Sequence, residues 1–297
     1  MNRGHLLTEQ INTASVNLDQ LSALEIVDLF NQEDQKTIDA IAQARQELAQ
    51  TIDITAQSLR KGGRLFYIGA GTSGRLGVLD AAECPPTFCT NPDMVQGILA
   101  GGESALVKSS EALEDRSEDG ATAMLDRSIG NLDVVIGITA GGTTPYVHGA
   151  LEEAKKLGAV TVAISCVPKE QVTISADIDI RLLTGAEILA GSTRLKAGTV
   201  TKMALNIIST GVMVKLGKVY GNRMIDVSVT NSKLEDRALR IISDLTDLSR
   251  EDSIELLKAS GYKVKLALLM HWSQKTKDEA EILLTKNDGN LRKSLLT

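Results

Sequence analysis

The spacing of hydrophobic and polar positions divides the chain into three regions. Residues 5–20 show no regular period, so we expect an irregular arm there, either a disordered tail or an arm laid on a neighbouring surface. From 23 to 61 apolar side chains recur at helical spacing, which predicts a short helix at 23–30 and a long one at 33–61. A capping box, Ser22 with Glu25, begins the first of these helices.

The second region alternates short apolar runs with helical patterns. Five runs rich in β-branched residues predict strands at 65–68, 94–99, 134–138, 160–165 and 178–183. Helical patterns lie between most of them, at 75–82, 104–113, 121–126 and 145–157. Continuous apolar strands that alternate with helices are typical of a parallel sheet covered on both faces. The fold class is therefore α/β.

The last region is helical only. A long helix is expected at 195–216, followed by a connector at 226–237 and a small bundle of three or four short helices. We divide the chain into an N-terminal arm with helices (1–54), an α/β domain (55–230) and a small helical domain (231–297).

Composition narrows the possible partners and the compartment. The chain has 297 residues and a net charge of -6, which argues against nucleic acid as the main partner because binding its phosphates requires a basic face. Three cysteines without a CxxC pair indicate a reducing compartment and no zinc site. We find no signal peptide and no uninterrupted apolar run long enough to span a bilayer, so a soluble cytoplasmic protein is expected.

The most distinctive local motif is a glycine-rich turn at 69–74 that follows the first predicted strand. Gly71 lets the backbone approach a ligand, and Thr72 and Ser73 add hydroxyl donors where the next helix begins. A dinucleotide site also fits the G-x-G-x-x-G spacing, but the acid required about 20 residues later would fall at 92–95, before the second strand. The turn therefore predicts a phosphate-binding site. The alternative is a tight turn in which the glycines have no further function.

Two other segments carry candidate binding residues. The turn at 139–145 places Gly141, Thr143 and Thr144 between a strand and a helix, where they can bind the same phosphate or serve only as a helix cap. The segment 191–199 puts two cations at a helix start, against the helix dipole, which suggests a bound anion unless they are a surface pair. Its candidate ligands are Ser192, Thr193 and Lys196.

Two glutamates are candidates for proton transfer. Glu83 precedes Cys84-Pro85-Pro86 at the expected end of a helix, where the dipole disfavours a carboxylate and favours its protonated form. Glu114 lies where another helix is expected to end. The alternative for both is an ordinary solvated surface acid. His5, His148 and His271 are isolated in the sequence, and no metal-ligand pattern appears.

Several long motifs resemble one enzyme family. Residues 62–88, 97–105, 112–115, 143–147, 186–199 and 221–234 closely resemble the N-acetylmuramic acid 6-phosphate etherases, a family with the sugar isomerase (SIS) fold. The resemblance extends over nearly the whole chain. Outside that family the chain also resembles glucokinase regulatory protein, which binds sugar phosphates without being an enzyme.

The resemblance implies a five-stranded α/β/α sandwich, a homodimer and a small C-terminal helical domain like a ubiquitin-associated fold. It implies a carbon–oxygen lyase that cleaves N-acetylmuramic acid 6-phosphate into N-acetylglucosamine 6-phosphate and D-lactate during cell-wall recycling or catabolism. It also implies that Glu83 is the proton donor and Glu114 the second acid, here the base. No cofactor or metal is expected.

The chain departs from the family pattern at one turn. Gly141 stands where the family usually has serine, and Thr143 where it usually has arginine. Gly185-Ala186-Glu187 replaces a frequent Gly-Pro-Glu. Two other functions thus stay open beside the etherase: a sugar-phosphate-sensing regulatory protein and a sugar-phosphate isomerase.

Overall fold

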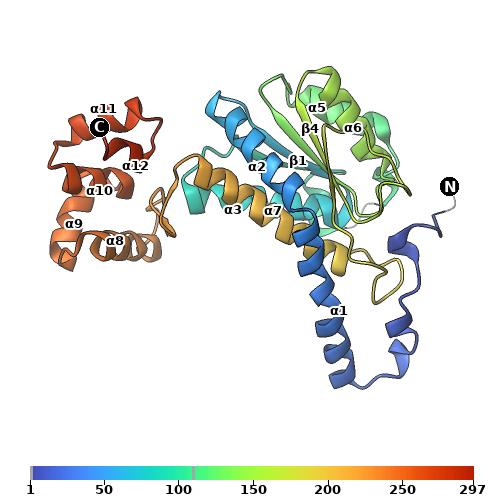
Figure 1. Cartoon of the computed structure of the whole chain (residues 1–297). Coiled ribbons are helices and arrows are strands. Elements are labelled where there is room, and N and C mark those ends of the chain that lie inside the picture. Colours follow the sequence, from blue (N-terminus) through green and yellow to red (C-terminus); the bar gives the residue numbers. More distant parts are fainter. Residues whose placement is uncertain (1–2, 109–110) are drawn as a thin grey trace. The chain divides into compact units, whose positions relative to one another are not determined.

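A five-stranded parallel sheet is the larger of the two sheets among residues 3–108 and 111–297, which the computed structural model describes (Figure 1). The strands lie in the order β2-β1-β3-β4-β5. Their bounds are β1 Leu65–Gly69, β2 Val95–Leu99, β3 Val134–Ile138, β4 Val160–Ser165 and β5 Ile178–Arg181. The sequence-based prediction of five parallel strands is confirmed. The chain order reverses between β1 and β3, and open α/β sheets bind ligands at such a switch point.

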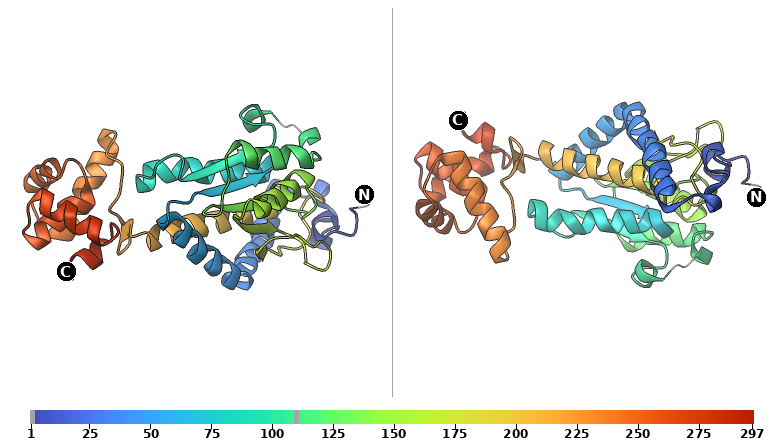
Figure 2. Two further views of the ribbon diagram at one scale, coloured as in Figure 1. Left: turned by 90° about the horizontal axis from the view of Figure 1, so that it is seen from above. Right: turned by 90° about the horizontal axis from the view of Figure 1, so that it is seen from below.

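Helices lie on both sides of this sheet (Figure 2). The helices of this part of the chain are α1 Ala23–Gln43, α2 Arg45–Arg60, α3 Gly71–Phe88, α4 Ser104–Val107, α5 Ser117–Asp126, α6 Pro145–Lys156 and α7 Lys196–Lys215. Alternate residues of β1 point to opposite faces, as the pleat requires. Phe66 and Ile68 pack in a buried cluster with Leu151 of α6. On the other face α3 approaches so closely that a Cβ at Gly77 would lie 2.7 Å from the Cβ of Tyr67.

A polar contact fixes α3 and α7 on that second face. The Tyr67 hydroxyl donates to Asp80 at 2.9 Å, and Ser209 of α7 donates to the same carboxylate at 3.0 Å. Burial raises the pKa of Asp80 above its usual value, although these two hydrogen bonds act in the opposite direction. The contact links one strand to two helices that begin at the same edge of the sheet.

Helix α3 differs from the prediction at both ends. It begins at Gly71, directly in the glycine-rich turn, and continues through Pro85 and Pro86 to Phe88. The two prolines lie in the last turns, where the helix loses only their own N–H bonds, and Cys89 still donates to the Pro85 carbonyl at 2.9 Å. The expectation that a helix ends at Glu83 is therefore wrong, because Glu83 lies inside α3.

Other predicted bounds also shift. The first two helices meet at Ala44 rather than near Phe30. The expected helix at 104–113 is replaced by the short α4 and a 3-10 turn, η4 (Glu111–Leu113). Residues 109–110 of that expected helix lie outside the described residues.

The N-terminal arm packs on the surface of its own chain. Its three 3-10 turns are η1 Leu7–Glu9, η2 Thr13–Ser15 and η3 Leu18–Gln20. Leu6 and Thr8 are each 1% exposed, and the Leu7 N–H donates to the Gln171 side chain at 2.9 Å. Of the two alternatives for the arm, the structure shows the one in which it is laid on a surface.

The chain forms two compact units. The α/β unit comprises Met1–Ala82 and Asp93–Ser209, and the helical unit comprises Glu83–Pro92 and Thr210–Thr297. The helical unit contains a short antiparallel pair, β6 Val219–Tyr220 and β7 Arg223–Met224, followed by α8 Ser232–Thr246, α9 Arg250–Ala259, α10 Val264–Ser273, α11 Lys277–Lys286 and α12 Leu291–Ser294. The small helical C-terminal domain is confirmed.

The connector expected at 226–237 is wrong in its second half. Asn231 caps α8 by accepting a hydrogen bond from the Leu234 N–H at 2.9 Å, so the helix begins at Ser232. The pairing of β6 with β7 was not anticipated, because two-residue strands leave no alternating pattern.

Helix α7 has a length and composition that would allow it to cross a membrane. Its most apolar window is 56% buried inside the protein, and Val200, Ala204 and Ile208 are fully buried. The apolar character of α7 is that of a helix packed in a protein core.

Candidate active site

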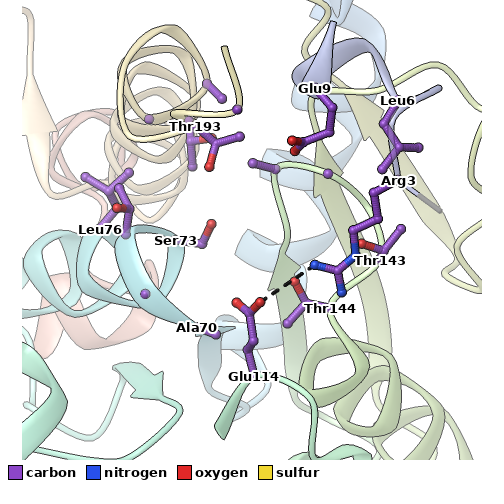
Figure 3. A pocket seen from close by; sticks show the side chains of 18 of the residues that line it. Arg3, Leu6, Glu9, Ala70, Ser73, Leu76, Glu114, Thr143, Thr144 and Thr193 are labelled. Carbon is purple, nitrogen blue, oxygen red and sulfur yellow. Dashed lines mark ion pairs between the residues drawn. The ribbon is translucent and has the colours of Figure 1, made fainter. Parts of the chain in front are cut away.

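A cavity of about 400 Å³ lies at the carboxyl edge of the sheet in the α/β unit. Five separate segments line it: the arm, the turn after β1, Glu114, the turn after β3, and residues between Gly191 and Thr201. Figure 3 shows their side chains converging on one space. The cavity lies at the switch point between β1 and β3, where the topology predicts a ligand site.

The first wall is the beginning of α3. Gly71, with a φ of +53°, Thr72 and Ser73 all line the cavity. A Cβ at Gly74 would lie 2.4 Å from the Gly69 carbonyl oxygen, so only glycine allows α3 to start this close to β1. The N–H groups of a first helical turn have no partner within the helix, and with the dipole they attract an anion.

The second wall is the turn after β3, and it contains Gly141, Thr143 and Thr144. The Thr144 hydroxyl lies 2.9 Å from that of Thr139 and makes no cap hydrogen bond to α6, so it does not serve as an ordinary side-chain cap. The ring of His148 contacts the Gly142 carbonyl oxygen at 2.7 Å. This histidine, which looked isolated in the sequence, holds the turn in place from the helix that follows it.

The third wall is the segment before α7. Thr193 lines the cavity, whereas Ser192 and Lys196 are not among the residues that line it. Lys196 is fully buried, and its ammonium donates to Glu33 at 2.7 Å. The expectation that Lys196 reaches a bound phosphate is therefore corrected: its charge is satisfied inside the protein.

The anion expected at the start of α7 belongs to the chain itself. The Glu187 carboxylate accepts the N–H groups of Lys196 and Ala197, each at 2.9 Å. Burial raises the pKa of Glu187, although these two N–H groups act against that shift. Glu187 stood out in the sequence only by its unusual neighbour Ala186, and its pairing with α7 was missed.

Glu33 completes this buried cluster. Burial by itself would raise the pKa of Glu33, but hydrogen bonds from Lys196, Lys36 and Asn12 outweigh it and lower the pKa to about 2. The cluster joins α1 to α7 through the ion pair of Glu33 with Lys196, and it joins the arm to α1 through the neutral amide of Asn12. Among the described residues, no group of three or more histidine, cysteine, aspartate or glutamate side chains could hold a metal ion.

The two predicted proton-transfer residues lie in different places. Glu114 lines the cavity and is half-buried, with its carboxylate 3.9 Å from the Arg3 guanidinium (Figure 3). Glu83 is exposed on α3 and does not line the cavity. It follows Ser73 by ten residues, which corresponds to about 15 Å along a helix. The residues that line this cavity therefore include Glu114 but not Glu83.

Sequence reasoning missed three charged residues of the cavity wall. Arg3 and Glu9 reach it from the arm, and Arg75 from the first turn of α3. The arm has no periodic pattern that would orient Arg3 or Glu9 toward any surface. Leu6 and Thr8 are buried, but Leu7 lies between them, so no alternation of apolar and polar residues marks the covered side of the arm.

Comparison with known proteins identifies the family. Residues 47–155 match the glucokinase regulatory protein N-terminal SIS domain, and residues 221–287 match the C-terminal lid domain of glucokinase regulatory protein. The N-acetylmuramic acid 6-phosphate etherase of Crocosphaera subtropica is 72% identical over 99% of this chain and 96% of its own length. That of Rippkaea orientalis is 73% identical over the same shares. On this identity across nearly its entire length, the chain belongs to the N-acetylmuramic acid 6-phosphate etherase family.

Proposed function

We propose that this protein cleaves the D-lactyl ether of N-acetylmuramic acid 6-phosphate, giving N-acetylglucosamine 6-phosphate and D-lactate. The observation that carries the proposal is Glu114, a carboxylate on the wall of a cavity formed by two strand-to-helix turns. The names of the close relatives support the same reaction. In a cell this activity recovers an amino sugar from cell-wall fragments.

The phosphate is proposed to bind at the start of α3. The N–H groups there and the hydroxyl of Ser73 favour an anion, and Thr143 and Thr193 offer further hydroxyls from the other walls. This placement leaves the sugar carbons to extend toward Glu114. Ser192 and Lys196 do not line the cavity, so we leave them out of the proposed phosphate site.

The reaction needs one base and one acid. In the open-chain sugar the C1 aldehyde acidifies the hydrogen at C2, and the Glu114 carboxylate removes that proton. The electron pair moves to form the C2–C3 double bond as the C3–O bond breaks, and an acid protonates the departing lactate oxygen. Water then adds to C3 of the unsaturated aldehyde and a proton returns to C2. Two carboxyls in opposite protonation states suffice for these steps.

Glu83 is the proposed acid, supplied by a second copy of the chain in a homodimer. Within one chain only Glu114 of the pair lines the cavity, and the exposed position of Glu83 on α3 leaves it accessible to another copy. Three free cysteines, Cys84, Cys89 and Cys166, fit a reducing cytoplasm as the place of action.

The reaction is tested by incubating the purified protein with N-acetylmuramic acid 6-phosphate in heavy-oxygen water. We expect D-lactate release with the label at C3 of the sugar product, because water enters there after elimination. Label in the lactate would contradict the mechanism. Aldose–ketose exchange without lactate would indicate an isomerase, and binding without any turnover would indicate a regulatory sugar-phosphate sensor.

The residue roles are tested by mixing two variants. Glu83→Gln and Glu114→Gln should each lose lactate release by about a hundredfold or more, the usual contribution of a positioned acid or base. Glu118→Gln, an exposed acid outside the cavity, is the matched control and should retain activity.

Dimers formed from one copy of each variant should regain activity. In such a dimer one site combines the intact Glu114 of one copy with the intact Glu83 of the other. If both glutamates acted within the same chain, mixing would restore nothing, and the proposed sharing of the site between copies would be wrong.

A further inference from the structure

We infer that Arg3, at the end of the N-terminal arm, binds the lactyl carboxylate of the substrate and so distinguishes the substrate from its sugar-phosphate product. This inference rests on the proposed function, because it assigns a second anion of the proposed substrate to a second part of the same cavity. Arg3 would then be a specificity-determining residue supplied by a segment outside the α/β core.

Among the described residues, the guanidinium of Arg3 at the cavity makes two ion pairs, both at long range. It lies 3.9 Å from the carboxylate of Glu114 and 3.8 Å from that of Asp115. Both separations exceed the range of charge-assisted hydrogen bonds, about 2.7–2.9 Å. The Arg3 side chain is 44% exposed and points toward Glu114 in Figure 3. Its planar fork of donors matches a carboxylate in bidentate geometry.

The chemistry of the substrate puts a carboxylate at this place. Glu114 is proposed to take the proton from C2, so C2 must lie against it. The lactyl group is attached at C3, the next carbon, and its carboxylate is only a few bonds further on. A cation beside Glu114 therefore meets the lactyl carboxylate when C2 meets Glu114.

The two anions of the substrate, its phosphate and its lactyl carboxylate, fit different parts of the cavity wall. The phosphate is satisfied by the start of α3 and by hydroxyls, as proposed above. The other arginine of the wall, Arg75, belongs to α3, and its Nε already donates to the Leu106 carbonyl at 3.1 Å. Glu9, which also lines the cavity, would repel an anion and suits the neutral hydroxyl or amide groups of the sugar.

The arm is held firmly enough to position such a residue. Leu6 and Thr8 are buried beside the turn after β3, and a Cβ at Gly141 would lie 3.7 Å from the Thr8 hydroxyl. Further along, the Asn12 side chain donates to Glu33 at 2.7 Å and to the Ala186 carbonyl at 3.2 Å. Binding residues on a segment anchored in this way lose little freedom when the ligand arrives.

The test combines a change in the protein with a change in the ligand. The ligands are N-acetylmuramic acid 6-phosphate, its derivative in which the lactyl carboxylate is a carboxamide, and N-acetylglucosamine 6-phosphate. With the wild-type protein, kcat/KM should fall about ten- to hundredfold from the acid to the carboxamide, the range expected for a hydrogen-bonded charge. With Arg3→Met the two substrates should react at similar, reduced efficiency. The inhibition constant of N-acetylglucosamine 6-phosphate, which has no lactyl group, should not change.

Arg116→Met is the matched control. Arg116 is another exposed arginine close to Glu114 in the sequence, but it pairs with Asp119 at 3.7 Å and does not line the cavity. This variant should behave as the wild type. The inference would be overturned by either of two results. In the first, Arg3→Met weakens the binding of all three ligands equally. In the second, the ratio of kcat/KM between the acid and the carboxamide stays at its wild-type value. If the wild type released no lactate, the proposed function would be wrong. Calorimetry with the same three ligands, on the wild type and on Arg3→Met, would then still decide whether Arg3 binds the lactyl carboxylate.

Discussion

At the scale of single residues, the cavity combines donors from turns that are far apart in the sequence. Ser73 comes from the start of α3, Thr143 from the turn after β3 and Thr193 from the segment before α7. From the resemblance we expect serine at the position of Gly141 and arginine at the position of Thr143 in the family pattern. We therefore propose that the phosphate subsite of this chain depends more on N–H groups and hydroxyls than on a cation.

Gly141→Ser should strengthen substrate binding. A Cβ at Gly141 would meet Thr8, Leu6 and Thr143 only at ordinary contact distances of 3.7–3.9 Å, and the new hydroxyl would face the cavity. We expect the free energy of unfolding to stay within about 0.5 kcal/mol and KM to fall several-fold, about one neutral hydrogen bond. Steady-state lactate release and urea unfolding measure the two effects.

The neighbouring glycine provides the control. Gly142 has a φ of +73°, and a Cβ there would lie 3.1 Å from Val167. Gly142→Ser should therefore lower the free energy of unfolding by about 1 kcal/mol or more. A Gly141→Ser protein that is equally destabilised, or that binds substrate more weakly, would contradict this account of the turn.

At the scale of elements, the buried cluster around Glu33 joins the arm to α1 and α7. Glu33 accepts hydrogen bonds from Asn12 of the arm and Lys196 of α7, and Glu187 accepts the first N–H groups of α7. The cluster fixes the start of α7, where Ala197 and Gly198 line the cavity. Its charges have a structural role rather than a part in binding the substrate.

Lys196→Met should destabilise the protein strongly. It leaves the Glu33 carboxylate, which is 4% exposed, without the fully buried one of the two lysines that pair with it at 2.7 Å, and removing one partner of a buried ion pair costs about 3–5 kcal/mol. Adding Glu33→Gln to Lys196→Met should recover part of that loss, because the carboxylate that has lost its buried partner becomes neutral. Urea unfolding of the two single variants and the double variant gives the coupling. Additive losses would contradict a direct pairing.

Stability should also depend on pH through Glu33. Its pKa of about 2 in the folded protein lies below its ordinary value of 4.5, so the unfolded chain binds the proton more readily. The contribution of ionised Glu33 to the free energy of unfolding is complete above about pH 4.5 and is lost as the pH falls from there toward 2. The difference in free energy of unfolding between the wild type and Glu33→Gln should shrink across this window. A difference that stays constant would indicate that Glu33 is not ionised in the folded protein.

At the scale of the whole molecule, the chain consists of an α/β unit, which contains the cavity, and a helical unit. The cavity contains the proposed base but not the proposed acid. We propose a homodimer as the assembly that brings Glu83 of one copy to Glu114 of the other.

Sedimentation should therefore give a particle of twice the chain's mass at concentrations where lactate release is full. Dilution that dissociates the particle should reduce the activity per chain in parallel, because each site needs two copies. Full activity from a monomer would contradict the sharing of the site between copies and would require a rearrangement within one chain.

The sequence alone determined the parallel sheet, its five strands and the glycine-rich start of α3. These features depend on contacts between near neighbours, such as continuous apolar runs for buried strands and glycines at a close strand-to-helix turn. Residues that sit in such local patterns, including Ser73 and Thr143, were therefore found in the cavity as expected.

Only the tertiary structure decided which charges face the cavity. Lys196 and Glu33 are 163 positions apart, and Arg3 and Glu114 meet from segments without a common period. A charge at a helix start looks the same in the sequence whether its partner is a ligand or a buried glutamate, because the partner arrives through long-range packing. For that reason Lys196, which was expected to bind phosphate, lies in the core. For the same reason Arg3, which no sequence pattern placed, lines the cavity.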